Sequence, residues 1–169
     1  IPELKKRLGA GSFEICICGG GTMHPRVKAE LKKHDEVKMM GYVDDIDLVL
    51  QEAKVLLTLN NAGSLKVGHT RYLHAWSLGT INIAHFDASL SMPELVHNFN
   101  ILMGKCMPDI VSEVVRALED CELREKIALM GFETLERFNN GKEVSAGIYQ
   151  DIKNVYQQKI DTIPRPTSN

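Results

Sequence analysis

Residues suited to holding an anion gather in one short segment, 60–71, between a continuous apolar run and a helical pattern. Its candidate ligand-binding residues are Gly63, Ser64, Lys66, Val67, Gly68, His69, Thr70 and Arg71. Backbone N–H groups at the start of a helix carry partial positive charge, and lysine and arginine side chains add whole charges. The segment contains no Asp or Glu. We therefore expect a loop that binds a diphosphate; the alternative is an ordinary capped loop with two solvated bases.

A second candidate for anion binding is the run of three glycines, Gly19, Gly20 and Gly21, between a β-favouring segment and a helical one. A ligand can approach a backbone without side chains closely, and N–H groups near a helix start suit an anion. The run departs from the strict G-x-G-x-x-G form, because Thr22 and Met23 follow it. A tight turn with one glycine at positive φ is the alternative.

Two further polar residues are considered for contact with a ligand. Glu94, in the segment MPELV, offers a carboxylate to hydroxyl groups; alternatively it is an acid at the start of a helix. His74 lies in the helix after the loop, where a single histidine is more often a surface or core residue. No Ser/His/Asp or Cys/His order indicates a nucleophile, and no His/Asp cluster indicates a metal site. Catalytic residues therefore stay unassigned, and no metal or cofactor is expected.

Composition narrows the function classes. The chain has 169 residues and a formal net charge of −2, which gives no reason to expect nucleic acid or an anionic membrane as main partner. The four cysteines, Cys16, Cys18, Cys106 and Cys121, form no C-x-x-C pair, so we expect buried, reduced thiols and a cytoplasmic location. No apolar run approaches the roughly 18–20 residues that a membrane span needs.

Strand-like and helix-like segments alternate along the chain. Strands are expected within 13–21, 36–43, 54–60 and 80–86, and helices within 24–34, 44–53, 69–79 and from 108 onward. The alternation predicts an α/β fold with right-handed βαβ units, in which an open parallel sheet carries helices on both faces. We expect one domain over 1–160 and a disordered tail over 161–169. The start, IPELKKRLGAG, lacks an initiator Met, so we expect a fragment of a longer protein.

The expected fold also indicates where a ligand binds. In an open α/β sheet, ligands lie beyond the carboxyl ends of the strands. The loops GGGTMH, GYVDD and NNAGSLKVGH follow successive expected strands. They are therefore predicted to meet at one edge of the sheet.

The order of these motifs is similar to that of a known family. The segments are FEICICGGG, VKMMGYVDDIDLVLQEAKVLLTL, GHTRYLHAWSLGTINIAH, MPELVHNFNILMG and DIVSEVVRALEDCELREKIALMGFETLERF. Over about residues 2–155 they resemble the C-terminal nucleotide-sugar-binding domain of GT-B fold glycosyltransferases of the group 1 type. The resemblance implies a Rossmann-like half of a GT-B fold.

That resemblance implies a transferase whose donor is a nucleotide-diphosphate sugar. The segment Gly63–Thr70 would hold the diphosphate, and Gly41, Tyr42 and Val43 would frame the base. A missing N-terminal domain would hold the acceptor, a glycan or a lipid-linked molecule. Membrane association is expected only through that missing part.

The chain departs from the family at two positions. The family usually carries two glutamates eight positions apart, and this sequence has Lys66 and His74 there. An imidazole can replace only part of the hydrogen bonding of a carboxylate that accepts both ribose hydroxyls. We favour an active transferase half with an altered donor site. The alternatives are a degenerate, noncatalytic GT-B domain that serves binding or assembly, and a generic Rossmann-like binding module.

Overall fold

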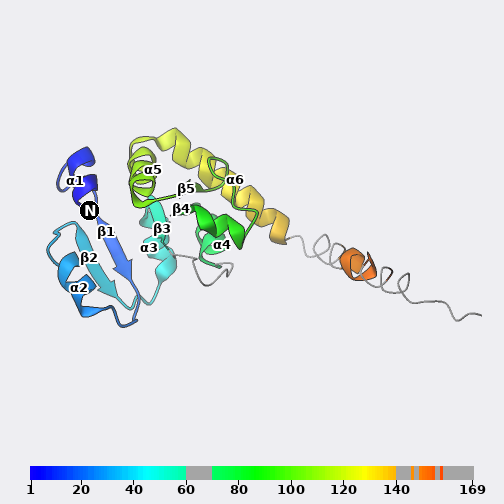
Figure 1. Cartoon of the computed structure of the whole chain (residues 1–169), viewed down its shortest axis with the longest axis horizontal. Helices are drawn as coiled ribbons and strands as arrows, with labels where there is room; N and C mark the ends of the chain where they lie inside the picture. The colour runs from blue at the N-terminus through cyan, green and yellow to red at the C-terminus, as the bar shows by residue number, and fades with distance from the viewer. Residues whose placement is uncertain (60–69, 140–145, 147–148, 155–156, 158–169) are drawn as a thin grey trace, which may run out of the picture.

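The structure, a computed structural model, describes residues 1–59, 70–139, 146, 149–154 and 157. Parallel strands alternate with helices through the first two ranges, which confirms the α/β prediction (Figure 1). The elements are α1 (Pro2–Leu8), β1 (Ile15–Cys18), α2 (Pro25–Leu31), β2 (Val37–Gly41), α3 (Ile46–Glu52), β3 (Val55–Thr58), α4 (Thr70–Ser77), β4 (Ile81–His85), the 3₁₀ helix η1 (Phe86–Leu90), β5 (Leu102–Gly104), α5 (Met107–Glu119) and α6 (Cys121–Asn139). The tail 161–169 lies outside the described residues.

The described strands form two parallel sheets, where the sequence predicts one. β1 pairs with β2, with Ile15 opposite Val37, and β3, β4 and β5 form the second sheet in that order. In Figure 1 the two sheets stand side by side, and α3 follows the first and precedes the second. β1 and β3 have four residues each. Each of them therefore pairs on one side only among the described strands, β1 with β2 and β3 with β4.

The second sheet contains the core of the molecule. Residues 81–84 of β4 are at most 1 % exposed. Ile81 and Ile83 point to one face and contact the buried side of α5, whereas Ala84 belongs to a second cluster with Tyr72 and Trp76 of α4. Burial on both faces is expected for a parallel strand that helices cover on both sides, although Asn82 places one polar side chain in this strand.

Trp76 fixes the position of α4 against α6. Its side chain is fully buried, and its Nε1 donates a hydrogen bond to the carbonyl oxygen of Asn100 at 3.0 Å. Gly131 of α6 lies directly against the indole, because a Cβ at this position would stand 2.3 Å from Cδ1 of Trp76. The two helices therefore approach closely only because residue 131 has no side chain.

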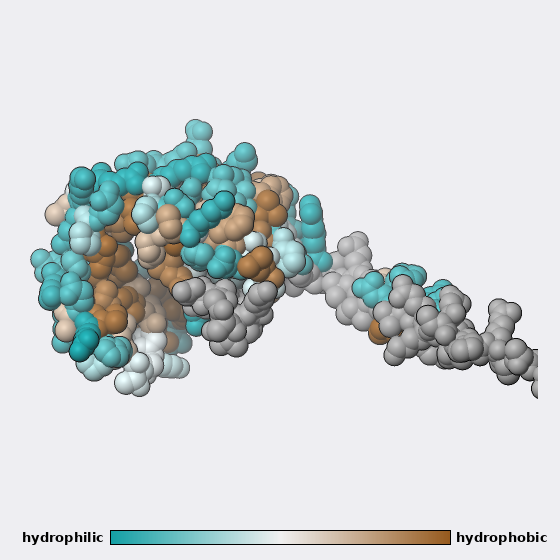
Figure 2. Space-filling model, viewed as in Figure 1, coloured by the Kyte–Doolittle hydropathy of each residue, from teal (hydrophilic) through white to brown (hydrophobic). Residues whose placement is uncertain are grey.

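The first sheet is far more open to solvent. Met39 and Met40 of β2 are 39 % and 44 % exposed, and Cys16 of β1 is exposed. Apolar side chains gather on this part of the molecule, at the left of Figure 2, with hydrophilic side chains around them. α2, the helix between these two strands, buries none of its residues. This helix therefore covers its sheet only loosely.

The prediction of buried cysteines is wrong. Cys16, Cys106 and Cys121 are exposed, and Cys18 is half-buried; all four are free thiols. Cys16 lies on the loosely covered sheet, and the other two exposed thiols lie at the starts of α5 and α6.

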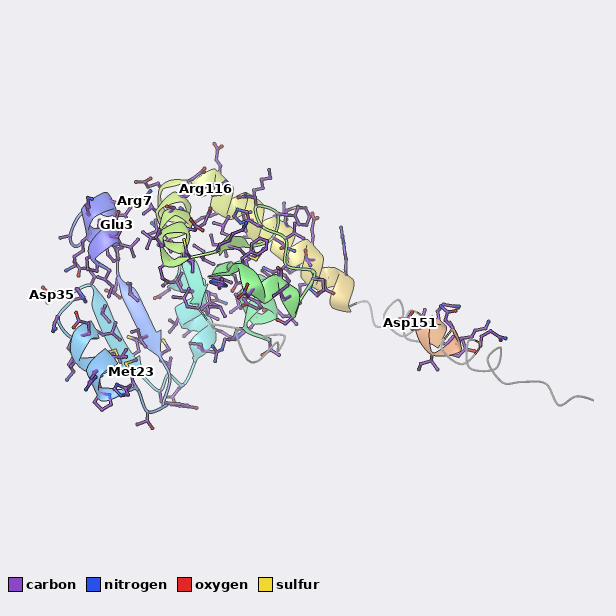
Figure 3. The ribbon with its side chains drawn as sticks, viewed as in Figure 1. Glu3, Arg7, Met23, Asp35, Arg116 and Asp151 are labelled. Atoms are coloured by element: carbon purple, nitrogen blue, oxygen red, sulfur yellow. The ribbon has the colours of Figure 1, made fainter. Side chains whose placement is uncertain are left out.

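Polar contacts connect α1 with the segment before β2 and with α5, and they connect α3 with the residue before β4. Lys5 Nζ lies 2.6 Å from the Glu36 carboxylate, and Arg7 donates a hydrogen bond to Ser112 Oγ of α5 at 3.0 Å. Thr80 Oγ1, just before β4, donates to the carbonyl oxygen of Leu50 in α3 at 2.6 Å. In Figure 3, Glu3 and Arg7 lie at the upper end of the β1–β2 sheet, and Met23 lies at its lower end, near the carboxyl ends of the strands.

Candidate functional site

The glycine run after β1 meets the end of β2, as the sequence predicts for two carboxyl-edge loops. Gly19 N–H donates to the carbonyl oxygen of Gly41 at 2.7 Å. Gly19 has φ +138° and Gly41 has φ +69°, conformations that residues with a side chain rarely adopt. Gly20 and Gly21 have no such φ, and a Cβ at either would meet nothing within 4 Å. The space above these two glycines is therefore open, as the close approach of a ligand requires.

The loop after β2 presents an aromatic ring to solvent. Tyr42 is 79 % exposed, and Val43 is half-buried. The loop ends at Asp45, whose Oδ1 accepts hydrogen bonds from the N–H groups of Asp47 and Leu48 at 3.1 and 3.3 Å. This side-chain cap starts α3 immediately after the loop.

The exposed side of α4 carries the polar residues of the candidate site. Tyr72, Ala75 and Trp76 are buried and anchor the helix. Burial raises the pKa of the Tyr72 hydroxyl. Thr70 and Arg71 are exposed in the first turn. The helix start thus presents a hydroxyl and a guanidinium next to the predicted diphosphate loop, whose residues Gly63, Ser64, Lys66, Val67, Gly68 and His69 lie outside the described residues.

His74 connects α4 with α3. Its Nε2 lies 2.7 Å from Oδ1 of Asp47, and the two side chains are 40 % and 54 % exposed. A carboxylate only accepts hydrogen bonds, so Nε2 carries the proton in this pair. Sequence reasoning missed Asp47; the acids that follow GYV were the available signal, but nothing in the sequence showed that they approach α4.

Glu94 lies in a turn and not at a helix start, so that alternative for it is wrong. The residues after η1 form turns, and Glu94 itself is exposed. Asn100 shapes this segment: its Nδ2 donates to the carbonyl oxygen of Glu94 at 2.8 Å and to Thr134 Oγ1 at 3.0 Å. Asn100 Oδ1 also accepts from the N–H of Val96 at 2.9 Å. The buried amide therefore holds the backbone of Glu94 while its carboxylate faces solvent.

A pocket of about 270 Å³ lies beyond the carboxyl end of β5, outside the predicted set of residues. Its lining is Phe86, His97, Met103, Lys105, Asp109, Ser112 and Glu113. Lys105 Nζ lies 5.4 Å from the centre of the Phe86 ring. The Asp109 carboxylate accepts hydrogen bonds from the Cys106 thiol and from the backbone N–H of Lys105. These hydrogen bonds, that of the thiol most of all, lower the pKa of the Asp109 carboxyl. The pocket shares no residue with the predicted site.

Neither a metal cluster nor a spanning helix is found in the described part of the chain. No group of three or more His, Cys, Asp or Glu residues is placed there to hold a metal ion. None of the helices in the same residues has both the length and the apolar character needed to cross a membrane.

Comparison with known proteins supports the fold through structure alone. No protein-family model and no curated protein matches the sequence. Among solved structures, Anabaena Alr3699/HepE in complex with UDP matches with a TM-score of 0.68 and 14 % identity, over 85 % of this chain and 42 % of that one. The C-terminal domain of the group 1 glycosyltransferase LpcC from Francisella tularensis matches with a TM-score of 0.55 and 18 % identity, over 66 % and 60 %.

A third match is to a protein that is named as an epimerase, not as a transferase. A putative UDP-N-acetylglucosamine 2-epimerase from Listeria monocytogenes matches with a TM-score of 0.53 and 14 % identity, over 90 % of this chain and 39 % of that one. The chain thus spans less than two thirds of each of these structures. Together the matches confirm the Rossmann-like fold of one GT-B half and the resemblance to the C-terminal domain of group 1 glycosyltransferases.

Proposed function

We propose that this chain is the nucleotide-sugar-binding part of a group 1 type glycosyltransferase. The observation that carries the proposal is the structural match over 85 % of the chain to a protein in complex with UDP. The match to a C-terminal domain of a group 1 glycosyltransferase supports the transferase class. The acceptor, a glycan or a lipid-linked molecule, would bind to the N-terminal domain of the full-length protein, which we expect to act in the cytoplasm.

Positive charge at the start of α4 would serve the diphosphate. Arg71, Lys66 and the N–H groups of the first helical turn would bind its oxygens. The same groups would stabilise the negative charge that develops on the diphosphate as it leaves the sugar. The backbone at Gly20 and Gly21, which is open to ligand approach, would supply further N–H donors.

The other predicted residues would contact the ends of the donor. The exposed ring of Tyr42 and the backbone of Gly41 and Val43 would frame the base. The carboxylate of Glu94 would accept hydrogen bonds from hydroxyl groups of the sugar. No residue of this chain is proposed as a catalytic acid, base or nucleophile, and no metal is proposed.

Lys66 favours a second candidate function, that of a noncatalytic GT-B domain. The resemblance places a glutamate beside the transferred sugar, and Lys66 reverses that charge. A domain that kept the fold but lost transfer would serve binding or assembly with a partner protein. If the domain has this second function, the full-length protein would transfer sugar from none of the nucleotide-sugar donors.

Calorimetric titration of the chain with UDP, GDP and ADP tests the proposal. We expect one of them to bind, and Lys66→Ala and Arg71→Ala each to weaken that binding about tenfold, since each removes a charge-assisted hydrogen bond. Lys54→Ala is the matched control, because Lys54 is an exposed cation at the amino end of β3, away from the carboxyl edge. Absence of binding by all three nucleotides, or strong binding of NAD instead, would contradict the proposal.

A further inference from the structure

The Asp47–His74 pair lies between the elements that the proposed function assigns to the base and to the diphosphate. Tyr42 lies in the loop before α3, and Asp47 lies in the first turn of α3. His74 follows Thr70 by four residues, which is about 6 Å along the axis of α4. A nucleoside diphosphate has its ribose between the base and the phosphates. The pair therefore stands where the ribose of such a ligand would lie.

The chemistry of the pair suits a vicinal diol. The hydrogen bond of 2.7 Å uses one oxygen of Asp47 and places the imidazole proton on Nε2 of His74. The second carboxylate oxygen of Asp47 has no hydrogen-bond donor among the described residues, and a carboxylate offers about four acceptor positions in all. The side chains are about half exposed, at 54 % and 40 %. The carboxylate thus keeps enough acceptor positions for the two hydroxyl donors of a ribose.

Among the three acids of this region, Asp47 is the one that is held toward α4. Oδ1 of Asp45 already accepts the hydrogen bonds that cap the start of α3. Asp44 is exposed, and within the described residues no hydrogen bond or ion pair orients its side chain. An acceptor whose orientation is already fixed loses less conformational entropy when it binds a ligand.

We infer that Asp47, oriented by His74, accepts hydrogen bonds from the 2′- and 3′-hydroxyls of the nucleotide ribose. The carboxylate that α4 lacks is then supplied by α3, from a neighbouring element of the fold. His74 acts as a positioning residue. This inference rests on the proposed nucleotide-binding function.

The test compares a ribonucleotide with its 2′,3′-dideoxy form. Of UDP, GDP and ADP, the one that binds the parent chain most tightly is titrated calorimetrically beside its dideoxy form. We expect the parent to bind the ribonucleotide about tenfold more tightly, as expected for hydrogen bonds to a charged group. Asp47→Asn should reduce this ratio to about one, whereas Asp44→Asn, the matched control, should leave it at about tenfold.

His74 variants test the positioning role with the same ratio. His74→Ala should lower the preference for the ribonucleotide, and His74→Gln, which still offers an N–H donor to Asp47, should retain more of it. A merely structural role of His74 would change both affinities together and leave the ratio unaltered.

The outcomes separate this inference from the proposed function. A parent chain that binds none of the three nucleotides contradicts both. A parent chain that binds, but shows no preference for the ribonucleotide or keeps it in Asp47→Asn, overturns only the role of Asp47. Equal loss of the preference in Asp44→Asn and Asp47→Asn would also overturn it, because the effect would then be one of general acidic charge.

Discussion

The two sheets of this molecule differ in how completely their side chains are covered. In the β3–β5 sheet, four consecutive residues of β4 are at most 1 % exposed, and helices cover both faces. In the β1–β2 sheet, Met39 and Met40 are about two-fifths exposed, and α2 buries no residue. The candidate base and ribose contacts lie on the open sheet and on the α3–α4 junction, whereas the buried sheet supplies most of the core. Stability and ligand binding are therefore expected to respond to different substitutions.

The largest difference between the two regions should come from truncating an aromatic side chain in each. Trp76→Ala removes a fully buried indole and its hydrogen bond to Asn100, and should cost about 3–5 kcal/mol of unfolding free energy. Tyr42→Ala, on the exposed loop, should change it by less than about 0.5 kcal/mol. Urea unfolding followed by circular dichroism measures both. Similar losses in the two variants would show that the regions are equally packed.

A glycine in each region sharpens the comparison. Gly104→Ala would place a Cβ 2.5 Å from the backbone nitrogen of Ile110, which cannot move aside, so we expect a cost of about 1–3 kcal/mol. Gly20→Ala meets nothing within 4 Å and has no positive φ, so its unfolding free energy should stay within about 0.5 kcal/mol of the parent. Thermal or urea unfolding distinguishes them. If Gly20→Ala is as damaging as Gly104→Ala, the space above the glycine run is not open.

The smallest expected effect is a change in the free energy of unfolding at acid pH, and it comes from the ion pair between Lys5 of α1 and Glu36 before β2. Lys5, 2.6 Å from the carboxylate, lowers the pKa of Glu36 below its ordinary value of 4.5. The ionised carboxylate therefore stabilises the fold at pH values above the ordinary pKa, and this contribution is lost as the pH falls through the lowered one.

The Glu36→Gln variant isolates this acid-side contribution. It should be less stable than the parent near neutral pH and should lose less stability on acidification below about pH 4.5. Urea midpoints measured from pH 7 to pH 3 check this. Glu30→Gln is the matched control, because the Glu30 carboxylate also has a neighbouring lysine but is exposed on α2. Parallel pH profiles of Glu36→Gln and the parent would contradict the assignment.

The sequence predicted the fold class and the meeting of the first two carboxyl-edge loops, because these depend on local patterns. The apolar run of β3, the Pro at the start of α5 and the glycines after β1 each act within a few residues. The contact of Gly19 with Gly41 followed from the rule that carboxyl ends of parallel strands meet.

Contacts between distant elements were not predictable in the same way. The approach of Asp47 to His74 joins residues 27 positions apart, and the role of Gly131 depends on an indole in another helix. The separation into two sheets was not predicted either. Hydrophobic patterns identify strands, but they do not show which neighbouring strands share hydrogen bonds. The roles of residues 60–69 remain predictions.

Two hydrogen bonds connect α3 to elements around β4. Asp47 in its first turn pairs with His74, and the carbonyl oxygen of Leu50, one turn later, accepts a hydrogen bond from Thr80. Although α3 follows the first sheet in the chain, it is thus fastened at two points to the body that contains β4. Residues 41–45 join β2 of the first sheet to this helix. The exposed ring of Tyr42 therefore stands on the short link between the first sheet and the elements around β4.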